Sequence, residues 1–415
     1  MADNTPAACD GMSDENSAVT CPDCGTPMPN GEPCPKCSTD AAGGFAWGRS
    51  RTVFLSLCGM FLIPMFTATG VIVRLFHDKQ AKIAVDWENA GNANLQSGHA
   101  QTAIEDFRNA LLYSSNKSRL QLELAEALAA QGHLEESEDY LSSLRADDPE
   151  NSLIDLQLAR ISARGGDVES AVGFYHDAAF GQWPSDPHAS RVACRKELIN
   201  FLLQNGRQDQ ARAEALSMAA DNPADPDIRS AAAAFLFRAG DAQDALNEYQ
   251  HVLQIEPDDL GALVGGGQSA LARGDFAEAD RYFARAMQHG SNDAGVQADR
   301  ELAGQAAELD PFDMRVSDKE RRGRAIEILT AADDRAKACV PAVLASPDAA
   351  PDNLKPLATA RAALPAKLSL PLLDARPEYA NQALDWAFSV EKIAPAQCAE
   401  TVADRAIEAL AEKNK

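Results

Sequence analysis

The pattern of hydrophobic and polar positions divides the chain into a short polar start, one apolar run and a much longer amphipathic region. Residues 1–20 show no hydrophobic period, which predicts a disordered lead-in. The run from Thr52 to Val73 contains no charged residue. At about 1.5 Å per residue, a helix of this length spans about 33 Å, close to the ~30 Å hydrocarbon core of a bilayer. The pattern therefore predicts one transmembrane helix over 52–73, since the run is too long and begins too late for a cleaved signal peptide.

From residue 84 onward the amphipathic pattern repeats. Glycines recur every 34 residues, with one longer step of 40 residues between Gly166 and Gly206; they are Gly98, Gly132, Gly166, Gly206, Gly240 and Gly274. A small residue follows each glycine by five positions, and mostly apolar residues follow that one by four and seven, which is one face of a helix. A second amphipathic helix precedes each glycine. Each unit is therefore predicted to be a pair of helices joined by a tight turn, and such units stack into a solenoid.

The repeat resembles the tetratricopeptide repeat superfamily. Its pattern is matched best at Trp87, Gly91, Gly98, Ala103, Phe107 and Ala110, and six units within 84–293 cover 84–117, 118–151, 152–185, 192–225, 226–259 and 260–293. The resemblance implies a solenoid in which the first helix of each pair lines a concave groove that holds protein or peptide ligands. The fourth unit departs from the pattern, with Ile199 where a small residue is usual and Ala215 where an aromatic is usual. Extra residues near 181–187 predict a bend or an excursion of the chain there.

Helical character continues beyond the repeats. Residues 294–339 are predicted to form capping helices, one over 294–309 and another opened by a capping box from Ser317 to Glu320. Residues 340–356 are predicted to be a linker, and 357–415 a C-terminal helical unit. The predicted fold class is thus all-α, a solenoid of the tetratricopeptide type with a C-terminal helical unit, preceded by a small zinc ribbon and one transmembrane helix.

The zinc ribbon is predicted over 21–38 from two Cys-x-x-Cys knuckles, formed by Cys21, Cys24, Cys34 and Cys37. Four thiolates suit tetrahedral Zn²⁺, and a site closed by four protein ligands is structural. The pattern is similar to the short zinc ribbons that begin many bacterial membrane proteins, although Ser38 replaces the glycine that usually follows the second knuckle. Two disulfides, a redox dithiol or an iron site remain alternatives. Residues 39–51 are predicted to be a linker.

Five polar residues are candidates for the groove. Applying the spacing of the superfamily places on the first helices Arg160, Arg164, Lys196, Asn200 and Arg238. Lys196 and Asn200 resemble half of the carboxylate clamp by which some relatives hold a peptide C-terminus, whereas Ala231 and Ala234 stand where the other half is expected. These residues either focus an anionic ligand or are solvated charges on an exposed face.

Charge and composition narrow the classes of function. The chain carries 38 Lys+Arg against 62 Asp+Glu, a formal net charge of −24, which argues against nucleic acid as a partner. No histidine has the spacing of a metal ligand or of a nucleophile's base. Gly265 to Gly267 lacks the lysine and Ser/Thr that a phosphate loop needs. Neither a catalytic residue nor a small-molecule substrate is therefore expected.

The cysteines also bear on location. Thiolates persist as metal ligands most readily in a reducing compartment, so residues 1–51 are predicted to lie in the cytoplasm. The chain is then a single-pass protein of a bacterial inner membrane. The lipid bilayer surrounds residues 52–73, and the repeats lie in the periplasm. Cys339 and Cys398 then either form a disulfide or remain buried free thiols. The leading hypothesis is a membrane-anchored, non-catalytic scaffold of bacterial envelope assembly. The alternative is a transmembrane sensor or regulator whose ribbon contacts a cytoplasmic protein or nucleic acid.

Overall fold

The computed structural model describes residues 19–28, 34, 36, 47–394 and 398–414. The chain divides into two compact units, Met1–Leu120 and Gln121–Lys415. The regular elements of the described residues are helices, apart from a small antiparallel hairpin of β1 (Val19–Thr20) and β2 (Pro27–Met28). The predicted all-α solenoid is confirmed. Most of the predicted lead-in over 1–20 lies outside the described residues, but Val19 and Thr20 are paired in β1, so the prediction is wrong for these two.

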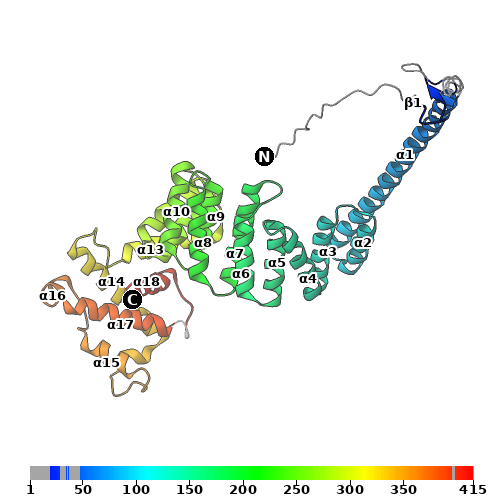
Figure 1. Cartoon of the computed structure of the whole chain (residues 1–415). Coiled ribbons are helices and arrows are strands. Elements are labelled where there is room, and N and C mark those ends of the chain that lie inside the picture. The colour runs from blue at the N-terminus through cyan, green and yellow to red at the C-terminus, as the bar shows by residue number, and fades with distance from the viewer. Residues whose placement is uncertain (1–18, 29–33, 35, 37–46, 395–397, 415) are drawn as a thin grey trace, which may run out of the picture. The chain divides into compact units, whose positions relative to one another are not determined.

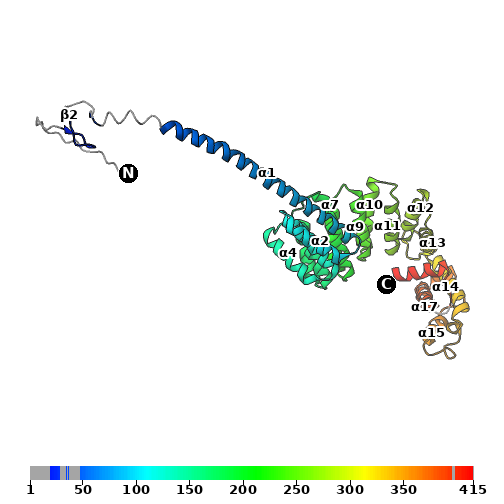
Figure 2. The ribbon, with the colours of Figure 1, turned by 90° about the vertical axis from the view of Figure 1, so that its right-hand side faces the viewer.

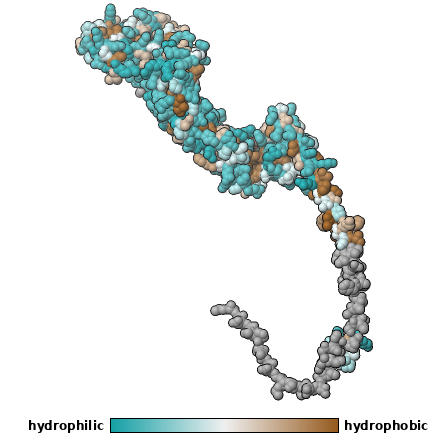
Figure 3. Space-filling view, turned by 90° about the horizontal axis from the view of Figure 1, so that it is seen from above, coloured by the Kyte–Doolittle hydropathy of each residue, from teal (hydrophilic) through white to brown (hydrophobic). Residues whose placement is uncertain are grey.

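In the first unit, α1 (Trp47–Gln96) is one uninterrupted helix of 50 residues (Figures 1 and 2). It contains both the predicted membrane span and the first helix of the first repeat, because no glycine or proline lies between residues 74 and 83 to end it. The predicted linker over 39–51 is therefore wrong for residues 47–51, which belong to α1. Among the described residues, Ser56–Gln96 is the one helical stretch long and apolar enough to cross a membrane. Its hydrophobic side chains are exposed, and Figure 3 shows them as a brown stretch beside the grey residues.

The first helix pair is completed by α2 (Ala100–Tyr113), which packs against the end of α1. A Cβ atom at Gly91 would lie 2.7 Å from the ring of Phe107, so only glycine allows this close approach. Near the turn, Asn94 Nδ2 donates a 2.7 Å hydrogen bond to Asp106 Oδ2. The two helices are thus held together by a buried aromatic ring and by a polar contact.

The helices that follow along the chain are α3 (Lys117–Gln131), α4 (Leu134–Asp147), α5 (Ser152–Gly165), α6 (Val168–Phe180), α7 (Pro187–Gln204), α8 (Gln208–Asp221), α9 (Pro226–Arg238), α10 (Ala242–Ile255), α11 (Leu260–Ala272) and α12 (Phe276–Gln288). All six periodic glycines adopt positive φ, between +71° and +95°. This left-handed conformation is the one that glycine adopts without steric cost and that closes a helix end. The sequence period therefore marks the turn inside each pair.

The fourth repeat accommodates its departures from the pattern. Ile199 and Ala215 are both fully buried in one core cluster, so a large residue on α7 is balanced by a small one on α8. The extra residues before α7 run beside the α4–α5 connection: Gln182 N donates to Glu150 O (2.7 Å), and Ser152 N donates to Gln182 O (3.1 Å). The other extra residues lengthen α7 at its N-terminal end, where Asp186 is the N-cap and Pro187 is the first helical residue. Here the insertion is absorbed as ordered structure.

The last helices form one packed body. They are α13 (Ala294–Leu309), α14 (Asp318–Cys339), the 3₁₀ helix η2 (Pro341–Leu344), α15 (Lys355–Ala363), α16 (Leu370–Ala375), α17 (Glu378–Ile393) and α18 (Val402–Lys413). Residues from α13, α14, α17 and α18 share one core, which also includes Phe276 of the last repeat. The separation predicted between capping helices and a C-terminal unit is therefore not seen, and the predicted linker contains η2. The C-terminal α18 packs on α13 (Figure 1), so the last hairpin is completed by a helix far away in the sequence.

Candidate functional site

The predicted groove residues lie on three first helices, α5, α7 and α9, and hydrogen bonds connect these helices directly. Arg160 of α5 donates through Nε and Nη2 to the two carboxylate oxygens of Glu197 on α7, at 2.8 and 2.7 Å. Arg238 of α9 donates through Nη1 to Asn200 Oδ1 on α7, at 2.8 Å. One face of the solenoid thus brings together residues from three consecutive repeats.

Arg160 is held in an internal ion pair. Tyr175 also donates to Glu197, at 2.9 Å, so this carboxylate accepts from two side chains. Burial alone would raise the pKa of Glu197, but hydrogen bonding to Arg160 and its charge outweigh burial and lower it. The hydrogen bond to Glu197 likewise raises the pKa of Arg160. Arg160 therefore contributes little free positive charge to a ligand.

The other four predicted residues keep more freedom. Asn200 Nδ2 donates to Lys196 O of its own helix at 2.9 Å, which orients its amide oxygen toward Arg238. Arg238 and Arg164 are exposed, and Lys196 is half-buried. Arg238 also lies over the ring of Phe235, 5.7 Å from its centroid. Ala231 and Ala234 stand where the second half of a carboxylate clamp would need polar residues. Arg238, on the same helix, supplies a cation beside Asn200 instead.

Three of the four predicted metal ligands come together in the first unit. The sulfur atoms of Cys21, Cys24 and Cys34 all lie within 4.8 Å of one another, with 3.5 Å between Cys24 and Cys34. Tetrahedral zinc with bonds of about 2.3 Å places its sulfur ligands about 3.8 Å apart, so this cluster has dimensions that fit a metal. The knuckle turn is made by Gly25, whose φ is +69°. Cys37 lies outside the described residues.

The structure joins Cys339, at the end of α14, to Cys398, shortly before α18, in a disulfide with a Cα–Cα distance of 5.6 Å. Cys194, in contrast, is a buried free thiol on α7. Burial raises the pKa of Cys194 to about 12. It is therefore chemically inert at neutral pH.

One turn before Cys339 lies a buried charged cluster that the sequence did not indicate. Arg335 Nη1 donates to Ala399 O at 2.6 Å and lies 3.0 Å from Asp404 Oδ2, while its Nε lies 3.6 Å from Glu391 Oε2. The three side chains are only 3 to 9% exposed. Burial, reinforced by the charge of Asp404, raises the pKa of Glu391 to about 7. The cluster ties α14 to the start of α18.

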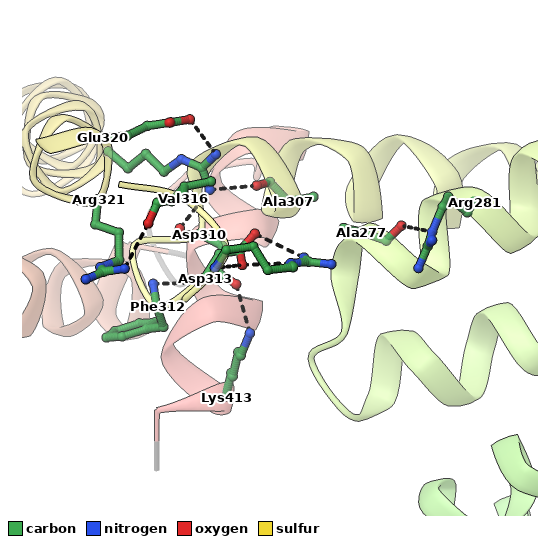
Figure 4. Close-up of polar contacts among 12 residues, drawn as sticks. Ala277, Arg281, Ala307, Asp310, Phe312, Asp313, Val316, Glu320, Arg321 and Lys413 are labelled. Carbon is green, nitrogen blue, oxygen red and sulfur yellow. Dashed lines mark hydrogen bonds and ion pairs between the residues drawn. The ribbon is translucent and has the colours of Figure 1, made fainter. Parts of the chain in front are cut away.

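Between α12, α13 and α18 lies a hollow of about 290 Å³ with many charged side chains (Figure 4). Four of the charged side chains that line it form two ion pairs. Lys413 donates to Asp310 Oδ2 at 2.8 Å, and Arg315 donates to both oxygens of Asp313 at 2.8 and 3.0 Å. Hydrogen bonds from Arg315 lower the pKa of Asp313 to about 2. The contact of Lys413 fastens the C-terminal helix to the end of α13, and the two pairs leave no poised acid or base among these four side chains.

Sequence reasoning missed Glu197 and Arg335. Glu197 could have been found, because it occupies a groove position on the first helix that follows the one carrying Arg160. Arg335 gave no signal, since an arginine after two aspartates on an amphipathic helix resembles an ordinary exposed residue.

Comparisons with known proteins agree with this geometry. The model of the Tetratricopeptide repeat family matches residues 94–161 and 236–299, and that of the Bacterial transcriptional activator domain matches residues 159–263. No curated protein matches the chain.

The solved structures to which the chain is similar include a tetratricopeptide repeat protein from Parabacteroides merdae, which is 15% identical over 61% of this chain and 93% of its own, with a TM-score of 0.35. A repeat-containing protein from Cytophaga hutchinsonii is 12% identical over 58% and 94%, with a TM-score of 0.40. PilF from Pseudomonas aeruginosa is 16% identical over 53% and 97%, with a TM-score of 0.35.

The two matched segments include glycine turns of the 34-residue period, and the helices between them follow the same pairing. This chain is therefore an all-helical solenoid of the tetratricopeptide repeat type, a protein-interaction scaffold.

Proposed function

We propose that this scaffold is anchored in a bacterial inner membrane and binds acidic or carboxylate-bearing segments of protein partners on the face formed by α5, α7 and α9. The observation that carries the proposal is the hydrogen bond from Arg238 of α9 to Asn200 of α7, one turn along the same helix from the half-buried Lys196. Arg164 adds a further exposed cation on α5. Because Glu197 compensates Arg160, the remaining cations set the preference of this face for an anion.

The surrounding charge sharpens this preference. The whole chain has a formal net charge of −24, so a partner with acidic groups is repelled by most of the surface. A local cationic face would then direct such a partner to one place. Charged hydrogen bonds contribute about 1.5–3 kcal/mol each in desolvated surroundings, enough for selective but reversible binding by a few contacts.

The proposed anchor is the apolar part of α1, with the N-terminal segment in the cytoplasm and the repeats on the far side of the membrane. Two groups of cysteines support this orientation. The sulfur atoms of Cys21, Cys24 and Cys34 lie within 4.8 Å of one another, as the ligands of one metal ion do, whereas Cys339 and Cys398 are joined in a disulfide. Metal-binding thiolates belong to reducing compartments and structural disulfides to oxidising ones. Tethering would concentrate the scaffold along the membrane, as assembly of the cell envelope requires.

For the N-terminal cluster, we propose a structural zinc site formed by Cys21, Cys24, Cys34 and Cys37. Purified full-length chain is expected to carry about one zinc per molecule by mass spectrometric metal analysis. Cys34→Ser is expected to lose most of this metal, because three ligands hold zinc far more weakly than four. Cys194→Ser is the matched control and should retain it, since Cys194 is buried in the repeats. Absence of zinc from freshly purified, reduced protein would contradict the assignment.

The groove is tested with a fluorescein-labelled peptide that carries four acidic residues and a free C-terminal carboxylate. Lys196→Ala/Arg238→Ala is expected to weaken its binding at least tenfold in fluorescence anisotropy, since two charged contacts are lost. The control Arg281→Ala/Lys319→Ala makes the same change in net charge with exposed residues on α12 and α14. An equal loss of affinity in both variants would show that net charge, and not the groove, determines binding. Unchanged binding of the peptide by the groove variant would contradict the proposal.

The match to the Bacterial transcriptional activator domain favours one alternative, a regulator. The matched residues 159–263 include α7, α9 and the second half of α5, which carry the proposed groove. Under this alternative the groove reports an envelope signal, and the N-terminal segment contacts a cytoplasmic protein or DNA. A gel-shift assay with genomic DNA fragments distinguishes the two, since the scaffold proposal expects no shift.

A further inference from the structure

The first helix of the first repeat lacks a neighbour that later first helices have. Each of the first helices α5, α7, α9 and α11 packs on the second helix of the preceding repeat, which is α4, α6, α8 or α10. Leu158 of α5, for example, shares a core cluster with Leu141 and Leu144 of α4. Among the described residues, no helix precedes α1 that could cover its equivalent face. An uncovered end of a solenoid normally has a polar surface.

The uncovered face of α1 is apolar instead. The residue eight positions before the periodic glycine is buried in all five later repeats, as Leu124, Leu158, Leu198, Ala232 and Gly266. Its equivalent in the first repeat, Ala90, is only half-buried. Close to Ala90 on the same helix, Trp87 is 38% exposed and Ile83 is 40% exposed. The surface that the later repeats bury is therefore open on α1.

This face continues toward the membrane with the spacing of a coiled coil. Successive intervals of four, three, four and three residues separate Phe76, Gln80, Ile83, Trp87 and Ala90. Such heptad spacing keeps one stripe of a helix turned toward a partner helix. The repeat itself begins at residue 84, so the stacking of another repeat does not account for the part of the stripe that lies before it. A long partner helix does.

Lipid cannot cover most of this stripe. At about 1.5 Å per residue from Val73, Ile83 lies about 15 Å and Trp87 about 21 Å beyond the apolar run. The interfacial layer of a bilayer is only about 5 to 8 Å thick on each side. The stripe itself carries no charge, and the charged Asp78 and Lys82 lie on the other side of the helix. An apolar stripe in water is suited to contact with another protein surface.

We propose that the stripe formed by Phe76, Gln80, Ile83, Trp87 and Ala90 packs in parallel against the same stripe of a second copy, making the chain a dimer. Two copies anchored in one membrane present identical stripes at the same height and in the same direction, as a two-fold axis along the membrane normal requires. Gln80 is the single polar residue of the stripe, and a lone polar residue in such a contact fixes the register of the two helices. The inference rests on the proposed span of α1.

The first test measures dimerisation of the full-length chain in detergent micelles, by sedimentation at several detergent-to-protein ratios. Ile83→Asp/Trp87→Asp is expected to weaken the dimer at least tenfold, because it places charges in an apolar contact. Gln80→Asp/Ile83→Asp, which changes only residues before the repeat and so leaves its packing intact, should act in the same way. Val85→Asp/Leu112→Asp makes the same change in charge on exposed apolar residues outside the stripe and should leave the dimer unchanged.

The second test identifies the occupant in intact cells with a photoreactive benzoylphenylalanine in place of Ile83. A cross-linked product of twice the mass of the chain is expected, and the same replacement of Val85 should give none. A product of another mass at Ile83 would assign the stripe to a different protein and overturn the contact between copies.

Two further outcomes separate the dimer from the anchor on which it rests. A chain that remains monomeric in micelles and gives no product in cells, yet stays in the membrane during alkaline extraction, overturns the dimer and leaves the proposed span in place. Release of the chain by alkaline extraction contradicts the span, and the parallel arrangement is overturned with it.

Discussion

Arg335→Met is expected to lower the free energy of unfolding of the C-terminal body by about 3 to 5 kcal/mol, because it leaves two buried carboxylates without their cation. Arg335 is the cation that lies between Glu391 and Asp404 and also binds the carbonyl of Ala399. Methionine fills a similar volume, so the loss reports charge rather than a cavity. Chemical unfolding followed by the fluorescence of Trp386, which is buried in the same core, measures the effect.

The exposed pair of Arg376 and Glu378, with 3.6 Å between nitrogen and oxygen, provides the control. Arg376→Met is expected to cost less than about 1 kcal/mol, since solvent screens exposed pairs. Arg335→Met/Glu391→Gln should recover part of the loss, because it removes one of the two stranded carboxylates. If Arg335→Met and Arg376→Met cost the same, the cluster does not stabilise the body.

Removing the disulfide with Cys339→Ala/Cys398→Ala is expected to destabilise the same body by about 2 to 4 kcal/mol. The bond spans 59 residues of sequence, and closing a loop of that size removes much of the entropy of the unfolded chain. It also holds the start of α18 near α14, where Ala399 and Asp404 meet Arg335. Unfolding curves with and without a dithiol reductant measure the effect.

The reductant itself supplies the matched control. It transfers two electrons to the disulfide and yields two thiols, so it should lower the stability of the natural chain by the same amount and leave the double alanine variant unchanged. A natural chain whose stability is insensitive to complete reduction would contradict this. In whole cells, rapid alkylation followed by non-reducing electrophoresis shows whether the bond is present, and thereby whether the repeats lie in an oxidising compartment.

The groove shows where sequence reasoning reached its limit. The repeat period predicts Arg160, Lys196 and Arg238 on the first helices of their pairs, and the structure has them on α5, α7 and α9. It did not show that Arg160 is engaged by Glu197, because that contact joins two different repeats and depends on how α5 and α7 pack. Nor did it show that Arg238 reaches Asn200 and supplies the cation that the clamp pattern lacks.

Local rules account for what was predictable without coordinates. The 34-residue period, the six glycines with positive φ and the N-cap at Ser317, whose oxygen accepts from Glu320 N at 3.2 Å, all depend on residues close together in the chain. Hydrophobic periodicity and turn chemistry involve residues within a few positions of one another, so they can be predicted from the sequence. The apolar run over 52–73 is legible for the same reason.

Tertiary packing alone decided the rest. The pairing of α13 with α18, the cluster around Arg335 and the bond between Cys339 and Cys398 join segments separated by about 60 to 100 residues, as the contact from Lys413 to Asp310 illustrates. Such partners are chosen by the shape and charge of surfaces that exist only after the helices have packed. No sequence period links the segments that form these three contacts. The helical repeat architecture could therefore be predicted from the sequence, whereas the contacts that hold the C-terminal helices together could not.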